Sequence, residues 1–195
     1  MSKARRIAGA GGVLAVVALA GSAWLWLAVG GLDPANPRVG LSDIEVTVSQ
    51  RYKVPEMSSA VLSGRLNAPD IVVFDVREAD EFAHSHIAGA QRIDPGMSAQ
   101  AFLAKHGREL KGKVAVFYCA VGVRSAIMLD RVQAALPGYG ASAAYNLRGG
   151  IFRWYAAGRP VWSEAGEAAS VHPFDGDWKQ LLDRTLAARS NVRAP

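Results

Sequence analysis

The stretch VAVFYCAVGVRSAIMLDRV, residues 114–132, links a strand-like segment to a helix-like segment through a loop that holds the only cysteine of the chain. Residues 114–118 form an apolar, β-favouring run, and residues 125–129 begin a pattern typical of a helix. Cys119 is therefore expected between the carboxyl end of a strand and the amino end of a helix. Unpaired backbone N–H groups and the helix dipole favour an anion there, and a thiolate over a thiol.

A single cysteine cannot form a disulfide within the chain, so Cys119 has either a chemical or a space-filling role. A free cysteine in an isolated apolar strand is commonly a small buried hydrophobic residue. Here Gly122 permits a tight turn, and Arg124 adds a positive charge at the start of the helix. These two neighbours favour the chemical role.

Strand-like and helix-like segments alternate through residues 45–162, which we assign to one domain. Strands are expected within residues 45–52, 71–74, 91–93, 114–118 and 143–147, and helices within residues 55–62, 98–106 and 125–136. This alternation indicates an α/β fold with a five-stranded, mostly parallel sheet flanked by helices. Asp75, Cys119 and Arg148 each follow a predicted strand, and ligands of open α/β sheets bind beyond the carboxyl ends of strands. Arg148 would guide anions to that edge or remain a solvated surface residue.

Residues 1–30 have the pattern of a membrane anchor. A basic flank precedes residues 7–29, an uncharged and largely apolar stretch of 23 residues. Such a stretch is long enough to cross about 30 Å of hydrocarbon as a helix. The positive flank predicts a single-pass protein of a bacterial-type inner membrane, with the domain on the periplasmic side. The alternative is a signal peptide cleaved after Ala18-Leu19-Ala20, which would release the domain.

The remaining segments are a linker, residues 31–44, and a C-terminal extension, residues 163–195. In the extension four apolar residues recur at helical spacing: Trp178, Leu181, Leu182 and Leu186. We expect them to form an amphipathic helix that packs on the domain. The net charge is only +5 and the basic residues of the domain are scattered, which argues against a nucleic-acid partner. No feature of the sequence identifies a protein partner.

Three motifs resemble those of a single-domain rhodanese, a thiosulfate-type sulfurtransferase, and they occur in the order found in that family. The first motif is IVVFDVRE at residues 71–78, followed by EF at 81–82 and HIAGA at 86–90. The second motif is the loop CAVGVR at residues 119–124. The third motif is NLRGGI at residues 146–151, followed by Trp154 and by GRPV at 158–161. Ser85 departs from the family, which usually has glycine before the His-Ile pair.

The resemblance implies a rhodanese fold and a sulfurtransferase that moves sulfane sulfur from thiosulfate or a persulfide donor to a thiol or cyanide. Cys119 would be the catalytic nucleophile and would carry the sulfur as a persulfide. The rest of the loop would bind the anion, chiefly through backbone N–H groups: Ala120, Val121, Gly122, Val123 and Arg124. The expected partners are a small anionic sulfur donor and a thiol or cyanide acceptor, and no metal or organic cofactor is required.

Charged residues near the predicted site have two interpretations each. Arg124 either binds the oxygens of the donor or braces the loop by pairing with a carboxylate such as Asp75. Arg77 either lies near the substrate or pairs with Glu78 or Glu81, and the position of Arg77 favours the pairing.

Two other functions are compatible with parts of this sequence. A phosphatase or arsenate reductase of the related cell-cycle phosphatase type would need five residues between cysteine and arginine, whereas this chain has four. A non-catalytic, membrane-anchored interaction module would need neither the cysteine nor the glycine-containing loop. Both features therefore favour the sulfurtransferase.

Overall fold

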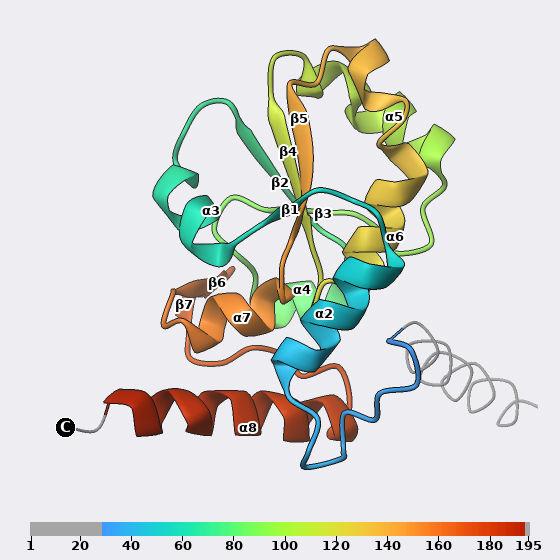
Figure 1. Ribbon diagram of the computed structural model, residues 1–195. Helices are drawn as coiled ribbons and strands as arrows, with labels where there is room; N and C mark the ends of the chain where they lie inside the picture. The colour runs from blue at the N-terminus through green and yellow to red at the C-terminus, as the bar shows by residue number, and fades with distance from the viewer. Residues whose placement is uncertain (1–28, 194–195) are drawn as a thin grey trace, which may run out of the picture.

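The computed structural model describes residues 29–193, and a five-stranded sheet with all strands parallel lies at its centre (Figure 1). The strand order is β1 (Glu56–Met57), β5 (Ala143–Leu147), β4 (Val114–Tyr118), β2 (Ile71–Asp75) and β3 (Gln91–Arg92). β4 is central and buried along its whole length, as its continuous apolar sequence predicts. Helices lie on both sides of the sheet, so the predicted α/β fold with a five-stranded parallel sheet is confirmed.

Five helices and two 3₁₀ segments connect the strands or follow them: α3 (Ser59–Arg65), α4 (Ala79–His84), α5 (Ala99–His106), η1 (Gly107–Leu110), α6 (Val123–Val132), η2 (Leu136–Tyr139) and α7 (Gly150–Ala156). Successive side chains of β4 point to opposite faces of the sheet and join two different cores. Val116 and Tyr118 belong to one core, whereas Phe117 and Cys119 belong to the other. The thiol therefore leaves the sheet on the side opposite to Tyr118.

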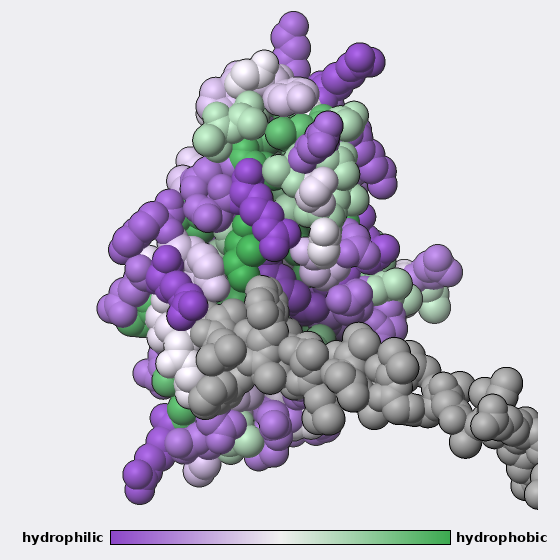
Figure 2. All heavy atoms as spheres, turned by 90° about the vertical axis from the view of Figure 1, so that its right-hand side faces the viewer, coloured by the Kyte–Doolittle hydropathy of each residue, from purple (hydrophilic) through white to green (hydrophobic). Residues whose placement is uncertain are grey.

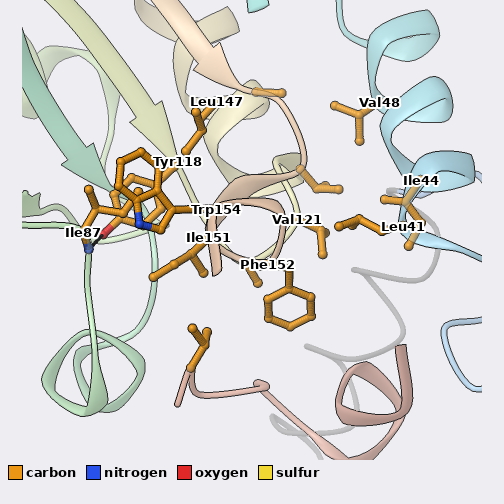
Figure 3. Packing of buried hydrophobic residues seen from close by; sticks show 14 of the residues in the cluster. Leu41, Ile44, Val48, Ile87, Tyr118, Val121, Leu147, Ile151, Phe152 and Trp154 are labelled. Atoms are coloured by element: carbon orange, nitrogen blue, oxygen red, sulfur yellow. Dashed lines mark hydrogen bonds between the residues drawn. The ribbon is translucent and has the colours of Figure 1, made fainter. Parts of the chain in front are cut away.

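The core that contains Tyr118 extends beyond the sheet to an N-terminal helix, α2 (Leu41–Arg51) (Figure 3). In Figure 3, Trp154 and Ile151 of α7 lie beside Tyr118, while Val121 of the cysteine loop lies toward α2. The cysteine loop is therefore part of a packed core.

The prediction of a strand within residues 45–52 is wrong, because this segment belongs to α2. Leu41, Ile44 and Val48 are spaced by three and four residues and are buried together, which is the pattern of one helix face. The β-branched residues that suggested a strand include Val46, which is 46% exposed. Burial of one helix face thus outweighed the local β-propensity.

The fifth strand is β1, and it lies within residues 55–62, where a helix is predicted. Its two residues pair with Asn146 and Leu147 of β5, and Pro55 accepts a hydrogen bond from the backbone N–H of Asn146. Helix α3 begins only after Ser58, whose hydroxyl accepts the backbone N–H of Val61 at 3.3 Å. A two-residue strand is too short to produce a periodic pattern in the sequence.

The C-terminal extension contains the predicted helix, α8 (Gly176–Arg193), and this helix packs on the domain. Trp178, Leu181 and Leu182 are buried, and α8 lies below α7 and α2 in Figure 1. Before α8 the chain forms a small antiparallel sheet of β6 (Val161–Ser163) and β7 (Gly166–Ala168). The sequence patterns did not predict this sheet.

The predicted linker is docked on the domain, and Leu32 in it packs against the core that contains Tyr118. Arg184 of α8 donates hydrogen bonds to three backbone carbonyls of this segment, those of Pro34 at 2.6 Å, Asn36 at 3.1 Å and Val39 at 3.1 Å. The segment is therefore held against α8.

The predicted membrane anchor, residues 1–30, lies outside the described residues except for its last two positions. Within residues 29–193, none of the helices combines the length and the apolar character that a membrane span requires. Hydrophilic side chains project over much of the coloured face in Figure 2.

Candidate functional site

The candidate site is the loop between β4 and α6. Gly122 is the residue before α6 and has a φ of 100°, a left-handed conformation that favours glycine. The backbone N–H of Gly122 donates to the Sγ of Cys119 at 3.2 Å, and its carbonyl accepts the side-chain amide of Asn146 at 3.1 Å. A Cβ at position 122 would approach Asn146 Nδ2 and the carbonyl of Leu147 at 3.4 Å. The loop thus curls back until a backbone N–H meets the sulfur.

The first residues of α7 bind the backbone of the cysteine loop. The backbone N–H groups of Ile151 and Phe152 donate to the carbonyls of Cys119 at 2.9 Å and Ala120 at 3.0 Å. Gly150 has a φ of 55°, and a Cβ on it would lie 2.3 Å from the Cys119 carbonyl oxygen. The third sequence motif is therefore in contact with the second.

Arg124 is held by a carboxylate that the sequence analysis did not assign to it. Its Nη1 and Nη2 donate to the two carboxylate oxygens of Glu81 at 2.6 and 2.8 Å, and the side chains are 5% and 1% exposed. Burial lowers the pKa of Arg124, but the hydrogen bonds to Glu81 and the electrostatic attraction of Cys119 and Glu81 outweigh burial and raise it. Arg124 therefore remains charged beside the loop, braced by Glu81 and not by Asp75.

The Nε of Arg124 is buried and has no hydrogen-bond partner among the described residues. Each of its two Nη atoms donates one N–H to Glu81. The guanidinium thus combines bracing with a buried Nε–H that remains available. The first turn of α6 also supplies backbone N–H groups that have no acceptor within the helix.

Asp75 and Arg77 form a second buried pair, separate from the first. Arg77 donates through Nε to Asp75 Oδ1 at 2.9 Å and through Nη2 to Asp75 Oδ2 at 2.7 Å, and both side chains are fully buried. The Arg77 Nη2 also donates to the backbone carbonyl of Ser85 at 2.5 Å. Arg77 thus pairs with Asp75 and not with Glu78 or Glu81, and the pair anchors the turn after α4.

Tyr118 lies between this pair and the segment that follows α4. Its hydroxyl accepts the backbone N–H of Ile87 at 3.0 Å, and its ring centroid is 5.8 Å from the Cζ of Arg77. Burial, followed by the nearby charge of Asp75, raises the pKa of Tyr118 well above its usual value. Tyr118 therefore stays neutral and has a supporting role under the loop.

Arg148 is not brought into the cysteine loop. It is about half exposed, and its Nε lies 3.6 Å from Glu45 Oε2 of α2. Arg153 binds the other oxygen of Glu45 at 2.7 Å, so both arginines share one carboxylate. Arg148 therefore contributes to the contact between α2 and the segment that follows β5. Within residues 29–193, no cluster of histidine, cysteine, aspartate and glutamate side chains has the arrangement of a metal site.

Sequence reasoning identified the loop residues but missed Glu81 as the partner of Arg124. The position of Glu81 in the first motif was a signal of importance, yet that motif holds three carboxylates, Asp75, Glu78 and Glu81, and the sequence does not distinguish among them as partners. The pairing depends on the turn after β2, where Glu81 also accepts the backbone N–H of Glu78 at 3.1 Å. This helix start turns the carboxylate of Glu81 toward α6.

Several solved structures are similar to this chain. A rhodanese-related protein from Thermoplasma volcanium is 27% identical, with 56% of this chain and 99% of that chain covered and a TM-score of 0.44. A thiosulfate sulfurtransferase from Pseudomonas aeruginosa is 23% identical, with 76% of this chain and 26% of that chain covered and a TM-score of 0.47. An As-Sb reductase from Leishmania major is 21% identical, with 53% of this chain and 78% of that chain covered and a TM-score of 0.46. No curated protein matches the sequence significantly.

The sequence profile of the Rhodanese-like domain matches residues 58–157, which are 100 of the 195 residues. The matched segment contains the cysteine loop, the buried pairs of Arg77 and Arg124, and the glycines at the start of α7. The match covers more than half of the chain, and this chain therefore belongs to the rhodanese-like domain family.

Proposed function

We propose that the protein is a sulfurtransferase that carries sulfane sulfur as a persulfide on Cys119. The observation that carries the proposal is the contact between the Gly122 N–H and the Cys119 Sγ at 3.2 Å, at the start of α6. A backbone N–H that already donates to the sulfur stabilises negative charge there without reorganisation during the reaction. The Arg124 guanidinium adds a fixed positive charge to the same loop.

In the first half-reaction, the Cys119 thiolate attacks the outer sulfur of thiosulfate. A bond forms between Cys119 Sγ and that sulfur, the sulfur–sulfur bond of thiosulfate breaks, and its electron pair leaves with sulfite. The product on the enzyme is a persulfide anion, so the total charge is unchanged. The loop N–H groups and the Arg124 Nε would stabilise the outer sulfur as negative charge collects on it.

In the second half-reaction, a nucleophilic acceptor attacks the outer sulfur of the persulfide. With cyanide, a carbon–sulfur bond forms, the persulfide bond breaks, and the Cys119 thiolate is regenerated as thiocyanate leaves. With a thiol, the thiolate form attacks and leaves as a persulfide. Neither step changes the number of electrons in the enzyme, so no redox partner is required.

The length of the cysteine loop disfavours the phosphatase alternative. The loop has only four residues between Cys119 and Arg124, one fewer than the related cell-cycle phosphatases need. The site thus suits a single sulfur atom better than a phosphate or arsenate group.

The test is to incubate the protein with thiosulfate and measure its intact mass. We expect a mass increase of one sulfur atom, removed by cyanide with release of thiocyanate, and its complete loss in Cys119→Ser. Since Cys119 is the only cysteine, the mass shift has only one thiol to which it can be assigned. A protein that gains no sulfur from thiosulfate or from glutathione persulfide would instead support the non-catalytic interaction module.

A further inference from the structure

The residues of the cysteine loop are buried, although both substrates of a sulfurtransferase must reach Cys119. Cys119 is 1% exposed and Arg124 is 5% exposed. The family profile matches residues 58–157, and segments outside this range contribute to the burial of the loop. Ala120, Val121 and Val123 share a core with α2 and with Val171 and Trp178 of the C-terminal extension.

Phe174 of the extension lies directly against the charged group of the site. Its ring centroid is 5.2 Å from the Cζ of Arg124, a cation–π distance. Phe174 has a φ of 77°, and no other non-glycine residue within 29–193 has a positive φ. A bulky residue in this conformation persists only where the surrounding structure determines it, and such residues cluster at functional sites.

Contacts on both sides hold Phe174 in place. Its backbone N–H donates to His172 Nδ1 at 3.1 Å, and Ser170 bonds through its hydroxyl to His84 Nε2 of α4 at 2.9 Å. On the other side, the Asp175 carboxylate accepts the backbone N–H of Trp178 at 3.1 Å and so starts α8. The ring therefore has a defined position beside Arg124.

We propose that Phe174 is a specificity-determining residue that limits the Cys119 site to small sulfur donors. This inference rests on the proposed function. Glu81 accepts one N–H from each Nη of Arg124, and the Phe174 ring packs against the same guanidinium, so an anion that approaches the Nε–H must fit beside the ring. Thiosulfate carries only oxygens around its inner sulfur, whereas a donor with an aryl group there would compete with the ring for space.

The experiment compares thiosulfate with benzenethiosulfonate as donors, with cyanide as the acceptor. Both donors give Cys119 their outer sulfur; the second releases benzenesulfinate in place of sulfite, so the chemistry is matched and only size differs. We expect Phe174→Gly to raise the kcat/KM ratio of benzenethiosulfonate to thiosulfate about tenfold, within the range that one pocket side chain contributes to discrimination. Glycine suits the positive φ, so the backbone conformation is retained.

Two further variants control the comparison. Trp162→Ala removes an exposed aromatic residue of β6 and is expected to leave the ratio unchanged. Phe174→Leu keeps apolar bulk and is expected to give an intermediate ratio; it also serves as the test if Phe174→Gly does not show a cooperative thermal melt. An unchanged ratio in a folded Phe174 variant would overturn the proposal.

A second readout separates this proposal from the proposed function. Cys119 is the only thiol, so its alkylation rates with iodoacetamide and with the bulkier N-phenylmaleimide report access directly. We expect Phe174→Gly to raise the rate with N-phenylmaleimide several-fold more than the rate with iodoacetamide. If the wild-type protein transfers no sulfur but this selective increase occurs, the sulfurtransferase is wrong and the role of Phe174 in access stands. If the protein transfers sulfur and neither ratio changes, only the role of Phe174 is wrong.

Discussion

The positive charge beside Cys119 depends on one carboxylate. Glu81 accepts both Nη donors of Arg124, and the two side chains are almost completely buried. When one member of a buried pair is removed, the other keeps its desolvation cost and loses the attraction that offset it. Glu81 lies 43 positions before Arg124, so the first motif positions a residue of the second.

We expect Glu81→Gln to lower the free energy of unfolding by about 3 kcal/mol, because Arg124 would remain charged in a buried site without its counterion. Urea denaturation measures the change. Glu164→Gln, at an exposed position between β6 and β7, is the control and should alter stability little. A loss below about 1 kcal/mol for Glu81→Gln would mean that water compensates Arg124 and that the pair is not structurally required.

The proximity of residues within one loop could be predicted from the sequence, whereas the carboxylate partners of the arginines could not. Cys119, Gly122 and Arg124 stand in one loop, so their proximity follows from the sequence alone. The partner of Arg124 depends on which carboxylate the turn after β2 leaves free. Asp75 is already bound by Arg77 two residues later, and this contact leaves Glu81 for Arg124.

At the scale of elements, the loop and the start of α7 form one unit. Helix α7 begins with Gly150, whose missing side chain lets the chain pass against the Cys119 carbonyl. The backbone bonds from Ile151 and Phe152 then fix the loop carbonyls. The geometry around the sulfur is thus determined by two helices: α6, which begins at the end of the loop, and α7, whose first residues bind the loop carbonyls.

We expect Gly150→Ala to destabilise the fold by at least about 2 kcal/mol, because the backbone at this position has a positive φ and the new Cβ would meet a carbonyl oxygen. The displaced loop should also slow persulfide formation. Gly64→Ala in α3 is the matched control: no atom lies within 4 Å of its Cβ position, and alanine favours a helix. Equal thermal stability of the two variants would show that α7 can shift without cost.

Elements with a strong pattern could be predicted, and those determined by distant contacts could not. β2, β4 and β5 are uninterrupted or nearly uninterrupted apolar runs, and their predicted positions are correct. β1 has two residues and exists because β5 offers an edge, while α2 is a helix because one of its faces is covered by the domain. Neither cause is visible in the local sequence.

At the scale of the whole molecule, the two segments that flank the family match meet each other. Residues 34–39 lie against α8 through the three carbonyls that Arg184 binds, and α8 begins two residues after Phe174. α2 follows residues 33–39 and lies toward Val121 of the loop. Contacts near the two ends of the described chain are therefore linked to the surroundings of Cys119.

This arrangement predicts a local effect of Arg184→Ala. The lost hydrogen bonds should free residues 33–39 and increase hydrogen exchange at the amides of Asn36 and Val39, which bond to carbonyls within that segment. Arg131→Ala is the control, because Arg131 is exposed and donates a single long bond of 3.4 Å to the Pro95 carbonyl. If α8 and α2 act together on the loop, exchange should also increase in the first turn of α2, and alkylation of Cys119 should become faster. An increase confined to residues 33–39 would instead show that α2 holds its place through Leu41, Ile44 and the Glu45–Arg153 ion pair alone.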